Sequence, residues 1–195
     1  MKFLLLLLFP VFSYSQMKEP INLFNGKDLS GWEIFGTEKW YVENKNIVCE
    51  NGPDKDYGYL ATTEKFKDFE LNLMFKLVSK GLAGVFFHSD IIGNKISGMQ
   101  SEIAPPGSFS GGIYESYKRE WLIKPPVEID NVKMNSWNSM KVKVVGTEVT
   151  TWVNGKQMIY LNDAAIGEVD GKIALQIQGG GGIKVEWKNI KIIKL

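Results

Sequence analysis

The sequence has a single cysteine, Cys49, and a single histidine, His88, in 195 residues. One thiol cannot form an internal disulfide, so the fold must rest on its hydrophobic core. Cys49 lies in the apolar stretch NIVCE, which favours a small buried hydrophobe over a nucleophile. The zinc-binding motifs, the P-loop, the dinucleotide fingerprint and the GxSxG elbow are all missing. A Ser-His-Asp triad would have to use His88, and no serine or cysteine is an evident partner for it.

The sequence also lacks an excess of either charge. Lys and Arg together number 23 and Asp and Glu 22, which gives a net charge of +1. This balance produces no field that would favour nucleic acid or an anionic membrane. Hydrophobic residues make up 44% and charged residues 23%, as is typical of a globular protein. We therefore expect a globular protein with a neutral partner and no nucleic-acid partner.

No apolar run is long enough to span a membrane. The run from Phe3 to Phe12 follows Lys2 and contains Pro10, and it is about half of the roughly 20 residues that a span needs. Small and polar residues follow, with Ser13 and Ser15 at the positions that a signal peptidase reads. We predict a signal peptide over residues 1–15, cleavage before Gln16, and a single domain over residues 16–195. The protein would then be secreted or periplasmic, with no membrane span in its mature form.

Strand patterns account for nearly all of the remaining chain. In DFELNLMFKL and WNSMKVKV, apolar residues alternate with polar ones, which is typical of strands with one buried face. Asn154-Gly155 is a strong signal for a two-residue hairpin turn, and Asp170-Gly171 predicts a second tight turn. The phase of the alternation shifts near Lys188-Asn189, which predicts a bulge there. Many short strands without helices between them indicate an all-β antiparallel sandwich or barrel.

The side chains most suited to chemistry lie between Gly84 and Trp121. His88 follows the apolar end of VFFHSD, and SGMQSEI places Gln100 and Glu102 on one face of a strand. Tyr114 lies in the following strand. An imidazole, an amide, a carboxylate and a phenol on one sheet face would supply a base, an acid and hydrogen-bond donors. The alternative is that Gln100 and Glu102 are simply the solvated side of a half-buried strand.

Aromatic residues suggest the class of ligand. Trp121 and Trp137 adjoin loops and could stack on a sugar ring, since an aromatic face packs against the C–H face of a pyranose. The other four tryptophans have apolar neighbours in predicted strands, and we expect them to pack in the core or at its rim; they are Trp32, Trp40, Trp152 and Trp187. Amides and carboxylates bind sugar hydroxyls, so a neutral carbohydrate is the natural ligand. These residues do not distinguish a binder from a catalyst.

The chain resembles a known family in several stretches that occur in order from Ile21 to Leu195. The opening INLFNGKDLSGW is the most specific, and the resemblance continues in WYVENKNIV, GVFFHSD, SGMQSEI, GGIYES, SWNSMKV, VNGKQ, ALQIQG and WKNIKI. These stretches resemble the 3-keto-disaccharide hydrolase domain family. The resemblance implies a jelly roll of the concanavalin A-like type, found in secreted or periplasmic proteins of bacteria that degrade glycans. It also implies cleavage of glycosides that are already oxidised at C3 of the sugar.

The resemblance assigns residues by matching positions. Gln100 and Glu102 match the strand motif of the family, and Tyr114 matches its GxIY motif. The remaining matches are Trp137-Asn138 in the WN pair and Gln176 in the LQ pair. At two positions this chain departs from the family: most members have arginine where His88 stands, and many have histidine where Gln178 stands. Either the imidazole has changed position within one pocket, or this chain has lost turnover and kept binding.

Two hypotheses follow from the resemblance. In the first, the protein is an enzyme in which Glu102 or His88 is the base, Tyr114 a donor, and Trp121 or Trp137 the platform for the sugar. The substrate would also be held by Gln100, Asn138, Gln176 and Gln178. In the second, the same groove is a carbohydrate-binding, lectin-like module without turnover. The sequence requires no cofactor, and it leaves a divalent metal ion open.

Overall fold

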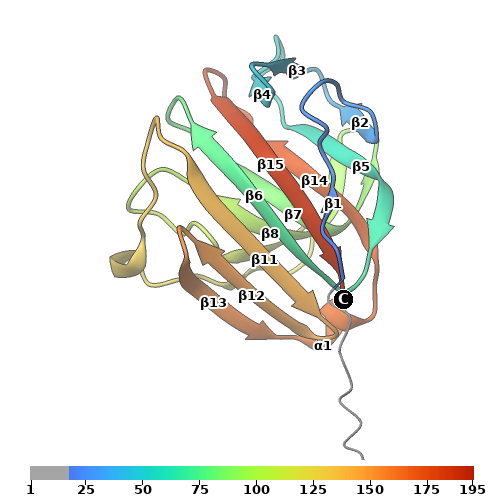
Figure 1. The fold of residues 1–195 in the computed structure, drawn as a ribbon. Helices are drawn as coiled ribbons and strands as arrows, with labels where there is room; N and C mark the ends of the chain where they lie inside the picture. The colour runs from blue at the N-terminus through green and yellow to red at the C-terminus, as the bar shows by residue number, and fades with distance from the viewer. Residues whose placement is uncertain (1–17) are drawn as a thin grey trace, which may run out of the picture.

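The computed structural model describes residues 18–195, which form two antiparallel β-sheets packed face to face (Figure 1). The signal peptide predicted over residues 1–15 and its cleavage site lie outside the described residues. The first sheet has, in spatial order, β13 (Lys156–Asn162), β12 (Glu148–Val153), β11 (Asn138–Val145), β6 (Phe69–Leu77), β15 (Lys184–Lys194), β4 (Asn46–Glu50) and β3 (Lys39–Glu43), with β1 (Ile21–Asn22) paired to β15. The prediction of an all-β, two-sheet sandwich is confirmed.

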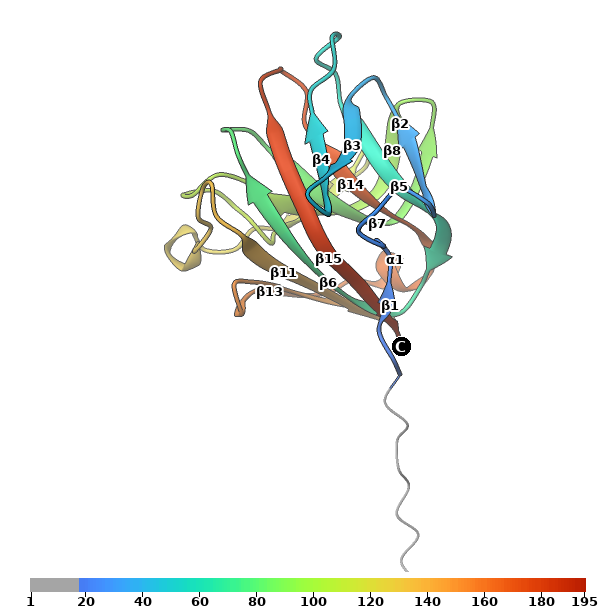
Figure 2. The same cartoon turned by 45° about the horizontal axis from the view of Figure 1, so that its top comes forward.

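The second sheet carries the candidate site. Its order is β10 (Glu120–Ile123), β9 (Ile113–Ser116), β8 (Lys95–Ile103), β7 (Ala83–Ile92), β14 (Gly171–Ile177), β5 (Gly58–Phe66) and β2 (Trp32–Phe35). The turned view in Figure 2 shows the two layers from another side. Within residues 18–195, helix is limited to α1 (Ala164–Gly167) and the 3-10 turn η1 (Val127–Ile129). No helix of this part of the chain is long and apolar enough to cross a membrane.

Alternation places one face of each sheet in the interior. In β6 the odd-numbered residues from Phe69 to Leu77 are buried, whereas the even-numbered residues between them are partly exposed. Val85 and Phe87 of β7 and Leu175 of β14 enter the same core from the opposite sheet. Each such side chain contributes about 1.5–3 kcal/mol of burial free energy. Cys49 is fully buried in this core, as predicted.

The second sheet also has an apolar cluster on its outer face. Its buried residues are Tyr59, Ala61, Phe86, Ile96 and Ala174, and they form a cluster separate from the interior core. In β7 and β14 these residues alternate with the core residues, so they must lie on the opposite side of the sheet. A solvated sheet face would not need such a cluster, and two of its residues, Tyr59 and Phe86, line the candidate site.

The turns agree with the sequence patterns except at one place. Asn154 and Gly155, between β12 and β13, have φ values of 49° and 78°, as the predicted hairpin turn requires. The register of β15 against β6 shifts between Lys188 and Lys191, where a bulge was predicted. The tight turn predicted at Asp170-Gly171 was wrong. Gly171 is already the first residue of β14, and α1 connects β13 in one sheet to β14 in the other.

Candidate functional site

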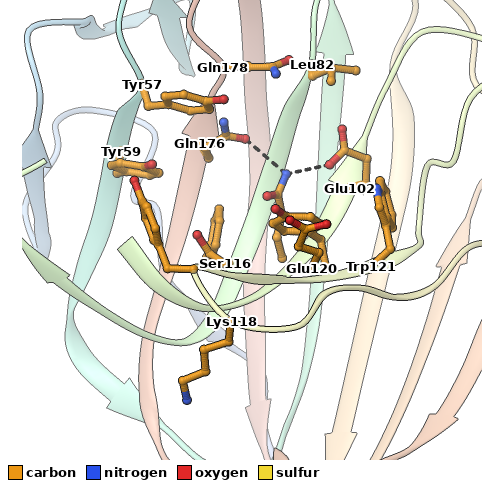
Figure 3. A pocket seen from close by; sticks show the side chains of 14 residues that line it. Tyr57, Tyr59, Leu82, Glu102, Ser116, Lys118, Glu120, Trp121, Gln176 and Gln178 are labelled. Carbon is orange, nitrogen blue, oxygen red and sulfur yellow. Dashed lines mark hydrogen bonds between the residues drawn. The ribbon is translucent and has the colours of Figure 1, made fainter. Parts of the chain in front are cut away.

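A pocket of about 490 Å³ lies on the outer face of the second sheet (Figure 3). Strand register builds its floor from two adjacent rows of paired residues. In one row Glu102 of β8 pairs with Gly84 of β7, and Gly84 pairs with Gln176 of β14. In the other, Gln100 lies between Tyr114 of β9 and Phe86 of β7. The full lining is Tyr57, Tyr59, Leu82, Phe86, Gln100, Glu102, Tyr114, Ser116, Tyr117, Lys118, Glu120, Trp121, Gln176 and Gln178.

Gly84 leaves room for an amide side chain to cross the floor. A Cβ atom at Gly84 would lie 2.5 Å from Nε2 of Gln100, well inside van der Waals contact. The Gln100 side chain therefore lies directly over the Gly84 backbone. From there its Nε2 donates a hydrogen bond of 2.7 Å to Oε2 of Glu102 and one of 3.4 Å to Oε1 of Gln176. Figure 3 shows Glu102 and Gln176 on either side of this amide.

Glu102 is the buried carboxyl group of the pocket. Its residue exposure is 5%, and burial raises its pKa from 4.5 to about 8 because the charged form loses its hydration. At neutral pH the carboxyl group of Glu102 is therefore protonated in most molecules. The prediction that Gln100 and Glu102 face a shared pocket is confirmed, and the alternative of a merely solvated strand face was wrong.

Tyr114 and Trp121 form an aromatic wall beside this floor. Trp121 pairs with Tyr114 across β9 and β10, and their ring centroids are 5.6 Å apart with planes at 78°. Phe109, from the long loop before β9, packs edge-on against Trp121 at 5.8 Å. Burial and the charge of Glu120 raise the pKa of Tyr114, so its hydroxyl group stays protonated and can donate. Both aromatic residues predicted here line the pocket.

His88 does not line the pocket, so its predicted place beside Glu102 was wrong. The register of β7 against β8 shifts between Phe87 and Asp90, and His88 has a φ of 47°. This bulge turns the imidazole inward, where it packs edge-on against Phe69 and Phe87. Its Nε2 lies 2.7 Å from the Lys67 carbonyl oxygen, which can only accept, so this nitrogen carries the proton. Burial lowers the pKa of His88.

Two further predicted residues lie elsewhere. Asn138 is fully buried at the start of β11, where its amide group bonds the backbone of Lys133 and Ser136. Trp137, just before it, lies beneath the amino groups of Lys76 and Lys188 on the other sheet. Neither residue lines the pocket, so the structure does not bring them together with Gln100 and Glu102. Gln176 and Gln178 do line it.

Sequence reasoning missed part of the lining. The sequence analysis did not single out Tyr59 or Phe86, nor the exposed rim residues Tyr57, Tyr117 and Glu120. Tyr59 and Phe86 are aromatic residues on the outward side of strands β5 and β7, whereas Tyr57 and Tyr117 lie just outside strands β5 and β9. Among residues 18–195, no three His, Cys, Asp or Glu side chains form a group that could hold a metal ion.

Comparison with known proteins gives the family. The model of the 3-keto-alpha-glucoside-1,2-lyase-like domain matches residues 19–193. The chain belongs to this family. A curated 3-keto-disaccharide hydrolase of Bacteroides thetaiotaomicron is 32% identical over 85 residues, which span 38% of this chain and 29% of that protein. The match thus covers less than a third of the curated relative.

Solved structures share the fold at low sequence identity. A candidate glycosyl hydrolase of Parabacteroides distasonis has a TM-score of 0.68 and 22% identity, with coverage of 90% of this chain and 94% of that chain. The carbohydrate-binding module CBM66 of Bacillus subtilis has a TM-score of 0.71 and 11% identity, with coverage of 88% and 99%. A Bacillus subtilis protein with a galectin-like fold also has a TM-score of 0.71, at 14% identity, with coverage of 90% of this chain and 94% of that chain. These likenesses confirm the jelly-roll sandwich.

Proposed function

We propose that this protein cleaves 3-keto-glycosides by elimination across C1 and C2 of the oxidised sugar, followed by addition of water. The observation that carries this proposal is Glu102, a buried carboxyl group with a pKa of about 8 in a pocket lined by aromatic rings and amides. Carboxyl groups with raised pKa values in concave pockets are typical of proton-transfer sites. Membership of the family and the name of the curated relative support the same chemistry.

The 3-keto group makes this route chemically accessible. It acidifies the hydrogen on C2, and the C1 substituent is then β to the carbonyl. A base removes the C2 proton, the electron pair forms an enolate on the C3 oxygen, and the C1–O bond breaks as the enolate collapses to an enone. The departing oxygen takes up a proton. Water then adds across the C1–C2 double bond, so the net reaction is a hydrolysis.

In this scheme Glu102, in its ionised form, is the base that removes the C2 proton. A base whose pKa is about 8 is stronger than an ordinary carboxylate, and the proton it gains is held in a buried site. Tyr114 donates its hydroxyl hydrogen bond to the enolate or the leaving oxygen. Gln176 and Gln178 bond sugar hydroxyls, and Trp121 packs against the C–H face of the ring. His88 takes no part, because its ring points into the sandwich.

The second candidate is a carbohydrate-binding module without turnover. It is favoured by the absence of histidine from the lining, since the imidazole found in many family members has no counterpart in this pocket. The similar fold of CBM66 supports it as well. In this case the pocket would hold an intact sugar through Trp121 and the three glutamines. In either case the predicted signal peptide would export the protein, and it would meet its glycan outside the cytoplasm.

Incubation with matched sugars tests the proposal. The purified protein is given a 3-keto-disaccharide and the parent disaccharide, and the released monosaccharides are followed by chromatography. We expect cleavage of the 3-keto compound alone, because the parent lacks the acidified C2 hydrogen. Binding of either sugar without cleavage would overturn the enzyme proposal and establish the binding module.

A further inference from the structure

A second groove lies on the opposite side of the molecule, on the outer face of the first sheet. Its volume is about 560 Å³, and it crosses strands β12, β11, β6 and β15. Register places four of its residues in one row: Trp152 pairs with Lys141, Lys141 with Asn72, and Asn72 with Lys191. The two grooves share no residue. The family chemistry therefore does not account for this one.

The chemistry of this groove differs from that of the first pocket. Two lysines line it, and its lining contains no carboxylate; the lining is Asn72, Leu73, Met74, Ser139, Met140, Lys141, Trp152, Gly155, Asn189 and Lys191. Lys191 is exposed and makes no ion pair with another described residue. Lys141 lies 4.1 Å from the centroid of the Trp152 ring and 3.9 Å from Glu70, so it is only loosely neutralised.

Local irregularity of β15 adds an amide to the groove. The bulge between Lys188 and Lys191 inserts an extra residue opposite Leu73, and Asn189 adopts a φ of 53° there. Bulges commonly redirect a side chain at a functional site. Here the bulge exposes Asn189 on the groove, where its Nδ2 lies 3.6 Å from the sulfur of Met74. Aromatic, amide, hydroxyl and cationic groups thus meet on a single face.

We propose that this groove binds an acidic polysaccharide, such as one built of uronic acids, and holds the protein on that glycan. Lys141 and Lys191 would pair with sugar carboxylates, and Ser139 and Asn189 would bond the hydroxyl groups. The Nδ2 of Asn72 donates to Oε1 of Glu70 at 3.1 Å, so Asn72 would offer its Oδ1 as an acceptor. The edge and free face of Trp152 would pack against a sugar ring. A neutral glycan would leave Lys191 without an ionic partner and Lys141 with only its 3.9 Å contact to Glu70, so the positive charges of the groove favour an anionic chain.

Affinity electrophoresis in gels that contain polygalacturonate tests this proposal, with amylose as the neutral control. We expect polygalacturonate to retard the wild type and amylose not to, and retardation should weaken as NaCl screens the charges. The double variant Lys141→Gln/Lys191→Gln should raise the dissociation constant for polygalacturonate about tenfold or more. The matched control is Lys65→Gln/Lys95→Gln, which removes the same charge from exposed positions on the other sheet.

The outcomes distinguish specific binding in this groove from non-specific electrostatic attraction. The proposal is supported if polygalacturonate retards the control variant as it does the wild type but no longer retards the groove variant. Both variants should have the melting temperature of the wild type. Equal loss in both variants, or no retardation of the wild type at low salt, would overturn it. Glu102→Gln should bind polygalacturonate as the wild type does, so failure of the proposed catalysis would leave this result unaffected.

Discussion

Nε2 of Gln100 lies 2.7 Å from Oε2 of Glu102, so the amide holds the buried carboxyl group in one orientation. The same amide reaches Gln176 on the other side of Gly84. Gln100 thereby links strands β8 and β14 across the bare backbone of β7. The geometry of the proposed base depends on this amide, and the amide depends on the missing side chain of Gly84.

Substitution of Gly84 tests that dependence. Gly84→Ala places a Cβ atom 2.5 Å from Nε2 of Gln100, so the amide must move and release Glu102. We expect lower thermal stability and loss of turnover. In a Gln100→Ala background the same substitution should cost much less stability, because the clashing group is gone. Equal costs in the two backgrounds, measured by urea unfolding, would show that the clash lies with other atoms.

The raised pKa of Glu102 predicts a pH-dependent stability. Its pKa is 4.5 in an unfolded chain and about 8 in the folded protein, so the folded state binds more protons between these values. Stability should therefore fall as the pH rises from about 4.5 to 8. Glu102→Gln cannot ionise and escapes this loss, so its melting temperature relative to the wild type should rise between pH 5 and pH 9. A constant difference across that range would contradict the raised pKa.

The two loop-flanking tryptophans should differ in sugar binding. Trp121 lines the pocket, whereas Trp137 lies on the other sheet beneath Lys76 and Lys188. Trp121→Ala should weaken binding of a 3-keto-disaccharide by about 1–3 kcal/mol in calorimetry, a typical loss for an aromatic contact in a pocket. Trp137→Ala should leave the affinity unchanged. The reverse result would move the binding site to the first sheet.

His88 should matter for stability and not for turnover. Asn tolerates positive φ, so His88→Asn keeps the bulge while it removes the hydrogen bond to Lys67 and the contacts with Phe69 and Phe87. We expect a lower melting temperature and a kcat/KM for 3-keto-disaccharide within a few-fold of the wild type. A loss of activity in the folded variant, with its melting temperature unchanged, would make His88 part of the chemistry.

Local alternation was sufficient to predict the face of β8. Gln100 and Glu102 are two positions apart, and the apolar Met99 and Ile103 require the core, so period two alone placed both polar groups outward. The same rule failed at His88. An even-numbered residue of β7 should lie beside Phe86 on the outer face, but the bulge between Phe87 and Asp90 reverses the alternation. No pattern in VFFHSD marks that extra residue.

Residues from distant strands could not be placed from the sequence. Tyr59 of β5 reaches the pocket because β14 pairs with both β5 and β7. The pairing of β14 with β5 joins segments more than a hundred residues apart. Asn138 failed for a different reason. Its amide satisfies backbone groups of its own loop, a local role that a polar residue beside a tryptophan does not reveal.

Deuterium exchange at C2 tests the role of Glu102 most directly. The probe is 1,5-anhydro-3-ketoglucitol, which has no aglycone at C1, so removal of the C2 proton is not followed by glycoside cleavage. Loss of the C2 proton signal is followed by proton NMR in D₂O. We predict rapid exchange with the wild type, increasing up to a pH near 8, and slower exchange with Glu102→Gln by about 10²–10⁴-fold. Exchange at the same rate in the two proteins would show that Glu102 is not the base.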